Sequence, residues 1–328
     1  MKIAYLDCFS GISGDMMIGA MIDAGFPVED LRRALAGLPL EGYTLEAAKE
    51  ERNHLFGTRF KVHVGRHHHP HRKFSDIKDL IRAGDLSPSV RDKSMAIFET
   101  LAVEEGKIHG CPAQDVHFHE VGAVDSIVDI VGSVLGIEFL GIAAVSASPL
   151  PLGSGFVETA HGRIPLPAPA TVALLKGIPV HDSGLKEELV TPTGAALVKG
   201  LARSFGPMPA MVLEQVGYGV GSRNLADRPN LLRLLIGQEE GTSNEETIVS
   251  LECNLDDTTP EWLGFLMERL FEAGALDVVF LPGYMKKNRP AVMVHVIGKP
   301  RHKDRLMGIL FAESTTLGVR FQYTQRRI

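Results

Sequence analysis

The sequence has few aromatic residues and no excess of positive charge, and both shortages exclude a class of partner. Aromatic residues make up 6% of the 328 residues, too few for a surface that stacks nucleic-acid bases. The formal net charge is −6, so the chain lacks the cationic excess that attracts a phosphate backbone. We therefore expect no nucleic-acid partner.

Cysteine and long apolar runs are also scarce, which points to a reducing, aqueous compartment. The three cysteines, Cys8, Cys111 and Cys253, are widely spaced, odd in number and without a CxxC pair, so a disulfide framework is not expected. The apolar stretch 124–145 is interrupted by carboxylates and glycines, which argues against a membrane span. A strand pattern starts directly after Met1, so no signal peptide is expected. These features predict a cytoplasmic protein without a membrane partner.

The most informative stretch is residues 117–132, HFHEVGAVDSIVDIVG. If residues 116–121 are extended, His117 and His119 point to one face, because side chains alternate along a strand. Residues 124–135 are typical of a buried helix, on which Asp125 and Asp129 share a face. Two imidazoles and two carboxylates suit a divalent metal such as Ni, Zn, Fe or Mn. In the alternative the histidines bond to backbone and Asp125 caps the helix, but burying unpartnered carboxylates is costly, which favours the metal site.

A second group of histidines forms a short internal tract with basic residues on both sides. The tract has no apolar residues to bury, so we expect a solvated loop. Tracts rich in histidine bind Ni, Cu and Zn, and an internal position argues against a purification tag. Loading or delivery of a transition metal is therefore predicted for His67, His68, His69 and His71.

Two glycine-containing loops lead into expected helices in the N-terminal part. The first strand, residues 2–6, ends at Asp7, and the loop after it leads into a helix over 16–24. Such a helix start often binds an anion, but the loop lacks both the Walker A lysine and GxGxxG spacing. Asp7 and Asp15 could instead hold a cation at the sheet edge, and in the plainer alternative Ser13 or Asp15 caps the helix. Residues 191–194 open a helix over 195–204, where capping by Thr191 is the simpler interpretation.

Proline and glycine mark further irregular backbone in the N-terminal part. Residues 148–170 are rich in both, and we expect loops at 150–155 and 160–165. His161 lies in the second of these, but a single histidine is more often structural. Residues 217–224 are rich in glycine without a following helix pattern.

The polar stretch 239–246 predicts a linker between two domains, residues 1–238 and 247–328. After it, expected strands at 247–253, 276–281, 291–297 and 318–323 and helices at 259–273 and 302–313 give the order β-α-β-β-α-β. That order is the ferredoxin-like split unit. The predicted fold class is therefore α/β (α+β), with a larger N-terminal α/β domain and a smaller ferredoxin-like domain.

Charged and hydroxyl residues occur on the expected loops of the ferredoxin-like domain. Carboxylates can hold a divalent cation and basic side chains can hold phosphates, so together they fit a metal–nucleotide complex. Ordinary solvated surface charge is the competing explanation. The candidate residues are Glu252, Asp256, Asp257, Lys286, Lys287, Arg289, Ser314 and Thr315.

Together these stretches resemble the LarC family, the nickel insertion proteins associated with lactate racemase. The matching segments are 7–15, the histidine tract, 117–132, 150–155, 161–169, 188–195, 254–261, 285–290 and 313–320. The resemblance implies an enzyme that inserts nickel into pyridinium-3,5-bisthiocarboxylate mononucleotide, forming one carbon–nickel and two sulfur–nickel bonds. The product would be the nickel-pincer cofactor of lactate racemase. CTP would be consumed to CMP and pyrophosphate with Mn(II) or Mg(II).

The nickel ligands and the base are a hypothesis drawn from the residues themselves, whereas the roles of the C-terminal domain are what the resemblance implies. The N-terminal domain would hold Ni(II) between His117, His119, Asp125 and Asp129, and His119 or Glu120 would take the ring proton that nickel replaces. The C-terminal domain would bind CTP and help to assemble a homo-oligomer, with the lactate racemase apoprotein as a recipient of the cofactor. Family members carry a further segment after the stretch matching 313–327, which implies a truncated C-terminal domain here.

Two other functions stay open on the sequence alone. A non-catalytic nickel carrier would bind the metal without turning over CTP. A metal-dependent hydrolase would use a water bound by histidine and aspartate to cleave an ester or phosphoester.

Overall fold

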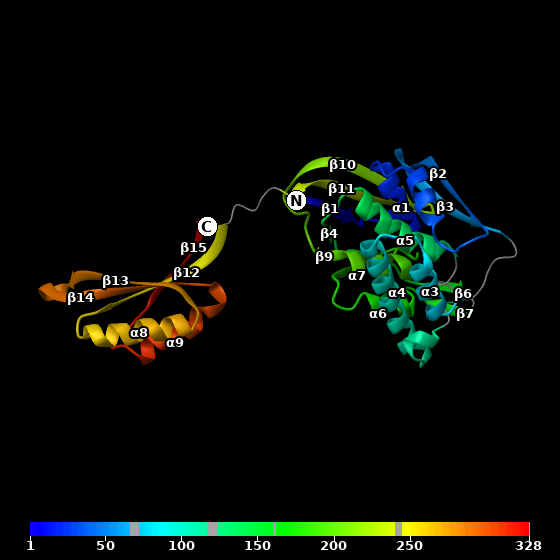
Figure 1. Cartoon of the computed structure of the whole chain (residues 1–328). Coiled ribbons are helices and arrows are strands. Elements are labelled where there is room, and N and C mark those ends of the chain that lie inside the picture. The colour runs from blue at the N-terminus through cyan, green and yellow to red at the C-terminus, as the bar shows by residue number, and fades with distance from the viewer. Residues whose placement is uncertain (66–71, 117, 119–123, 160–161, 240–244, 328) are drawn as a thin grey trace. The chain divides into compact units, whose positions relative to one another are not determined.

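The computed structural model describes residues 1–65, 72–116, 118, 124–159, 162–239 and 245–327. The chain divides into two compact units, Met1–Glu240 and Gly241–Ile328, each with its own sheet (Figure 1). Each unit also has its own hydrophobic core. The predicted class, a larger α/β unit followed by a ferredoxin-like unit, is confirmed. No helix in the described ranges combines the length and apolar character needed to span a bilayer.

The first unit is built on a seven-stranded mixed sheet in the order β2-β3-β10-β11-β1-β4-β9. The pairs β1–β4, β4–β9 and β3–β10 are parallel, and the other neighbours are antiparallel. The strands are β1 (Lys2–Asp7), β2 (Tyr43–Arg52), β3 (Leu55–Val64), β4 (Ala144–Ala147), β9 (Ala202–Phe205), β10 (Met211–Val220) and β11 (Leu231–Glu239).

Helices cover this sheet in successive layers. Helix α1 packs on β3 and β10, α5 packs on α1, and α4 packs on α5, α6 and α7 (Figure 1). Buried apolar side chains of these helices and of β1 and β11 form one continuous core. The helices are α1 (Gly14–Asp23), α2 (Val28–Leu35), α3 (Phe74–Ala83), α4 (Pro88–His109), α5 (Val124–Phe139), α6 (Pro169–Leu174) and α7 (Pro192–Leu201), with the 3-10 turn η1 (Ala113–Asp115).

Strand β10 includes the first part of the glycine-rich stretch 217–224, and its contact with α1 explains why glycine is needed there. Its residues up to Val220 are strand, which the glycine content of this stretch did not predict. A Cβ at Gly219 would lie 1.8 Å from the Met16 carbonyl oxygen, so only glycine lets α1 approach the strand this closely. The glycines therefore set the depth at which α1 sits on the sheet.

The loops expected at 150–155 and 160–165 are a wrong prediction in part, because both contain short strands. β5 (Leu150–Leu152) pairs in parallel with β8 (Val180–Asp182), and β6 (Phe156–Thr159) forms an antiparallel hairpin with β7 (Gly162–Pro165). Residues 160 and 161 lie outside the described ranges. Proline and glycine are tolerated here because these two-stranded sheets consist almost entirely of edges.

The second unit has the predicted order of elements. Its sheet is fully antiparallel, in the order β13-β14-β12-β15, and a compact apolar cluster forms its core. Residues 240–244 of the predicted linker lie outside the described ranges. The elements are β12 (Glu245–Leu255), α8 (Pro260–Glu272), β13 (Ala275–Met285), η2 (Lys286–Asn288), β14 (Arg289–Gly298), η3 (Pro300–His302), α9 (Lys303–Ala312) and β15 (Arg320–Arg327).

We predict that Gly219→Ala lowers the free energy of unfolding by about 3 kcal/mol, because the added methyl group overpacks the contact between β10 and α1. Urea denaturation followed by circular dichroism measures the change. Gly65→Ala is the matched control, since its Cβ would meet nothing closer than 3.5 Å. Equal stability of the two variants would contradict the close-approach argument.

Candidate metal and phosphate pocket

A pocket of about 360 Å³ opens where the first turns of α1, α5 and α7 meet β3. Of the predicted metal ligands, Asp15, Asp125 and Asp129 line it, so the structure brings together carboxylates from two separate sequence segments. The full lining is Ser13, Gly14, Asp15, Arg59, Phe60, Lys61, Val62, Asp125, Ser126, Asp129, Glu188, Thr191, Pro192 and Thr193.

Asp129 lies deepest of the three carboxylates. The residue is half-buried, but its Oδ1 atom has no access to solvent and no hydrogen-bond partner in the described part of the chain. Its side chain lies directly against Gly14, where an added Cβ would come within 2.3 Å of Oδ2. Burial raises the pKa of this carboxyl well above its usual 3.8, and the negative charges of Asp15 and Asp125 raise it further, against the opposing charge of Arg59. An enclosed carboxylate oxygen without a donor is what a cation or a ligand donor would complete.

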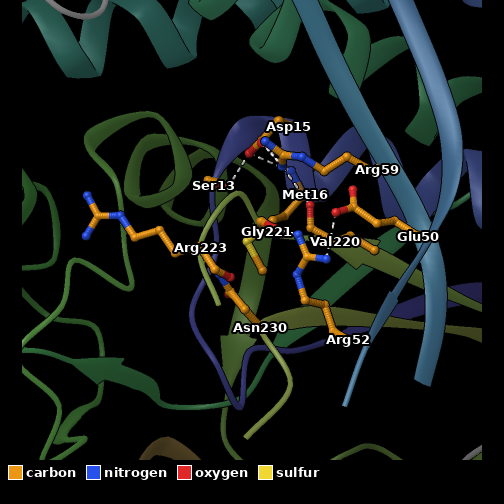
Figure 2. A network of polar contacts seen from close by, with 10 residues as sticks. All are labelled: Ser13, Asp15, Met16, Glu50, Arg52, Arg59, Val220, Gly221, Arg223 and Asn230. Atoms are coloured by element: carbon orange, nitrogen blue, oxygen red, sulfur yellow. Dashed lines mark hydrogen bonds and ion pairs between the residues drawn. The ribbon is translucent and has the colours of Figure 1, made fainter. Parts of the chain in front are cut away.

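Asp15 is held in place by Arg59 and by its own loop (Figure 2). Arg59 Nη1 donates to Asp15 Oδ2 and also to the Val220 carbonyl at 2.8 Å. Ser13 Oγ and the Met16 amide donate to Asp15 Oδ1, the amide at 2.9 Å. The Ser13 hydroxyl therefore does not cap α1, as the plainer interpretation proposed, but supports the carboxylate.

Arg52 contacts the backbone just after the end of β10, close to the contact that Arg59 makes with Val220. It donates to the Gly221 carbonyl at 3.2 Å and to Glu50 at 2.7 Å (Figure 2). Arginines of the β2–β3 hairpin thus fix the end of β10 beside the pocket. At the start of α7, by contrast, capping is confirmed, because Thr191 Oγ1 accepts from the Gly194 amide at 3.1 Å.

Asp7 takes a different position from the one predicted beside Asp15. Its Oδ2 accepts two bonds from Arg233, one of them from Nε at 3.0 Å, and it does not line the pocket. Across the described ranges, no three His, Cys, Asp or Glu side chains have the arrangement of a metal site. Asp15, Asp125 and Asp129 therefore supply only part of the set of donor atoms that a metal ion would need.

The predicted nitrogen ligands and the base lie outside the described ranges: His117, His119 and Glu120, with His67, His68, His69 and His71 of the tract. Residues flanking the two histidine groups are described and are bonded to each other. Phe118 N donates to the Arg72 carbonyl at 3.3 Å, and Phe74 N donates to the Val116 carbonyl at 3.2 Å. Arg72 and Phe74, just after the histidine tract, are therefore bonded to the residues on either side of His117.

Sequence reasoning missed the basic residues of the pocket. Arg59 and Lys61 are two apart on β3, so the alternation of strand side chains puts them on one face. That alternation around the buried Phe60 was the available signal. Their proximity to Asp15 depends on sheet order, which the local sequence does not contain.

The predicted nucleotide-binding residues of the second unit are divided between two pockets. Asp257, Ser314 and Thr315 line one of about 420 Å³, where Thr315 Oγ1 donates to Asp257 Oδ1 at 2.5 Å. Asp256 lines a second, of about 550 Å³, and pairs with Arg289 at 3.1 Å.

The remaining candidates in this unit line neither pocket. Glu252 pairs with Arg320 at 3.4 Å, an arginine that the sequence reading did not single out. Lys286 and Lys287 form the turn between β13 and β14, where Lys287 has φ 63°. The structure therefore brings Ser314 and Thr315 together with Asp257, and Asp256 together with Arg289. It does not bring all the candidate residues of this unit into one pocket.

Comparison with known proteins identifies the family. The model of the nickel insertion protein family matches residues 4–328. The chain belongs to that family. The predicted resemblance to LarC proteins is thus confirmed, over nearly the whole sequence.

Three matches illustrate the relationship. A "Putative nickel insertion protein" of Geobacter sp. (strain M21) is 52% identical over 100% of this chain and 85% of its own length. The "Pyridinium-3,5-bisthiocarboxylic acid mononucleotide nickel insertion protein" of Geobacillus kaustophilus (strain HTA426) is 47% identical over 98% of this chain and 82% of its own. The solved structure of "LarC2, the C-terminal domain of a cyclometallase involved in the synthesis of the NPN cofactor of lactate racemase, apo form" is 46% identical over 26% of this chain and 58% of that chain, with a TM-score of 0.25.

We predict that Asp129→Asn makes the protein more stable than wild type at pH 8. The substitution should also remove the part of the pH dependence of the free energy of unfolding that Asp129 causes. The folded state binds the Asp129 proton more tightly than the unfolded chain, so the free energy of unfolding falls as pH rises from 3.8 through the raised pKa. Each tenfold of tighter proton binding corresponds to about 1.4 kcal/mol.

Urea denaturation at pH 5, 6, 7 and 8, without added metal, measures this difference. Asp92→Asn, an exposed position on α4, is the control for removal of a carboxylate. A gap between wild type and Asp129→Asn that does not widen with pH would show that the carboxyl keeps its ordinary pKa.

Proposed function

We propose that this protein inserts Ni(II) into pyridinium-3,5-bisthiocarboxylate mononucleotide, in a CTP-dependent reaction that makes the nickel-pincer cofactor of lactate racemase. The observation that carries the proposal is the family match over residues 4–328, together with 47% identity to a relative named for this insertion. As a lyase-type cyclometallase it would act in the cytoplasm as a homo-oligomer, with the lactate racemase apoprotein as recipient of the product.

Nickel is a substrate in this reaction, and the pocket of the first unit is where we place it. Asp125 and Asp129 would supply oxygen ligands and His117 and His119 nitrogen ligands, with Asp15 close by. Support comes from Asp129 Oδ1, which is enclosed and lacks a donor in the described part of the chain. Oxygen and imidazole ligands hold nickel less firmly than thiolate-type sulfur, so the metal can pass to the two sulfurs of the substrate.

Formation of the carbon–nickel bond also requires a proton acceptor. The ring carbon exchanges its hydrogen for nickel, and the proton must leave to a base within hydrogen-bond reach. His119 or Glu120 would take it, because both belong to the segment that leads directly into α5. Asp7, paired with Arg233, would act at most as an outer charge in this scheme.

Nickel would reach the pocket through the histidine tract. The bonds from Phe118 to Arg72 and from Phe74 to Val116 tie the residues after the tract to those around His117. In this proposal, metal released from His67, His68, His69 or His71 passes to His117 and His119.

The second unit would bind CTP with Mn(II) or Mg(II). Asp257, Ser314 and Thr315 present the hard oxygen atoms that these ions prefer, in one pocket. The bound ion would neutralise phosphate charge. Asp256 and Glu252 would add carboxylates, and Lys286, Lys287 and Arg289 would contact the phosphates.

The direct test incubates the untagged protein with nickel, the pyridinium mononucleotide, CTP and Mn(II). The expected products are CMP, pyrophosphate and a nickel-containing mononucleotide in equal amounts, measured by chromatography and mass spectrometry. Omitting the pyridinium substrate controls for idle CTP cleavage. Nickel binding without CMP release would identify a carrier, and ester cleavage without CTP would identify a hydrolase; either outcome refutes the proposal.

We predict that His117→Ala with His119→Ala lowers the insertion rate by about 100-fold or more, because two metal ligands and a candidate base are removed together. The same assay measures the rate, and equilibrium dialysis measures bound nickel. His109→Ala, at the end of α4 and outside the pocket, is the histidine control. Unchanged nickel binding and rate in the double variant would remove these residues from the site.

Replacing the tract by serine, as His67→Ser, His68→Ser, His69→Ser and His71→Ser, is expected to act only on metal supply. Insertion should slow at limiting nickel, because the local density of imidazoles is lost. Excess nickel should restore the wild-type rate. A loss that persists at excess nickel would place the tract in the reaction itself rather than in loading.

A further inference from the structure

We infer that the pocket between α1, α5 and α7 also binds the phosphate group of the mononucleotide substrate, through Arg59, Lys61 and the first turns of α1 and α7. This inference rests on the proposed function for the identity of the ligand. It gives a binding role to residues of β3, α1 and α7 that are not among the proposed nickel ligands.

Two ten-residue helices begin at this pocket. The N-terminal amides of a helix lack partners within the helix and, with its dipole, favour an anion. Ser13 makes no capping bond to the backbone of α1. The Met16 amide of that first turn donates to Asp15 Oδ1, so the amides of Gly14 and Asp15 are the ones left for a ligand. At α7 the pocket is lined by Thr191, Pro192 and Thr193. Pro192 has no N–H and the Gly194 amide is capped by Thr191, so Thr193 supplies the first-turn amide that a ligand could use.

The two helix starts are fixed against each other by the backbone. Ile12 N donates to the Leu189 carbonyl at 2.9 Å, and Thr191 N donates to the Ile12 carbonyl at 3.2 Å. A Cβ at Gly194 would lie 2.2 Å from the Ile12 carbonyl oxygen, so α7 begins in close contact with the loop that precedes α1. Both helix starts are therefore held at one wall in advance of any ligand.

Basic side chains complete this wall. Arg59 is 10% exposed and is positioned by Asp15 and by the Val220 carbonyl. Lys61, two residues along the same strand, is exposed and lines the same pocket. A buried guanidinium with an exposed ammonium beside it suits a phosphate that must enter from solvent.

Asp129 shows that the ligand carries more than an anion. A free phosphate would leave its enclosed Oδ1 without a partner, and it would bring negative charge to Asp125 and Asp129. A bare cation would leave Lys61 and the remaining first-turn amides without a ligand, whereas Arg59 already pairs with Asp15. A phosphate joined to a cationic or metal-bearing ring satisfies both halves, and the pyridinium mononucleotide that receives nickel has this composition.

The test compares the pyridinium-3,5-bisthiocarboxylate mononucleotide with its dephosphorylated nucleoside by isothermal titration calorimetry on the full chain. Wild type should bind the mononucleotide about 30-fold tighter, the scale of a charge-assisted contact. Lys61→Gln and Arg59→Gln should each reduce this preference about tenfold. Lys93→Gln, an exposed lysine on α4, should keep it. Because Lys61 is exposed, its variant remains informative even if Arg59→Gln fails to fold.

The outcomes separate this inference from the proposed function. Equal binding of the two ligands by wild type, or a full preference retained in Lys61→Gln, overturns the phosphate site even if nickel insertion proceeds. A preference that Lys61→Gln reduces, in a protein that yields no nickel product, supports the phosphate site and refutes the insertion activity.

Discussion

The pocket depends on the absence of a side chain at Gly14. Any Cβ there would collide with Asp129, so the glycine lets α5 carry a carboxylate against the start of α1. The same helix is seated on the sheet by Gly219, which admits the Met16 carbonyl. Helix α1 is therefore packed closely against β10 on one side and α5 on the other. The position of Asp15 and the shape of the pocket follow from these two close contacts.

Electrostatics then determine what the pocket can hold. Asp15 already has a cation in Arg59, whereas Asp129 has an enclosed oxygen with no donor in the described residues and a raised pKa. Such a site resists ionisation until positive charge arrives, so a divalent metal and the carboxyl proton compete for the same oxygen. Moderate, proton-sensitive affinity of this kind suits the proposed transfer of nickel to sulfur, since a site of very high affinity would retain the metal.

Much of this architecture could be predicted from the sequence, because it is encoded locally. The periodicity of residues 124–135 gave α5 and the shared face of Asp125 and Asp129, and the order of elements after 247 gave the ferredoxin-like unit. The features that the sequence did not predict depend on contacts between segments that are distant in the sequence. Strand β10 was not predicted because its glycines make room for α1 and have low strand propensity. Arg59 and Lys61 were not predicted as site residues because the order of strands in the sheet places them at the pocket. The charges of the second unit were grouped by proximity in sequence, but strand register pairs Glu252 with Arg320 instead.

In the proposed function, nickel binds Asp129 Oδ1 in a pocket shared with Asp15 and Asp125. Crystals of the protein soaked in nickel, with diffraction recorded on both sides of the nickel absorption edge, test it most directly. We expect an anomalous peak within coordination distance of Asp129 Oδ1, about 2.1 Å, with the phosphate of a soaked mononucleotide beside Arg59 and Lys61. A nickel peak elsewhere in the chain, with Asp129 Oδ1 still unbound, would contradict it.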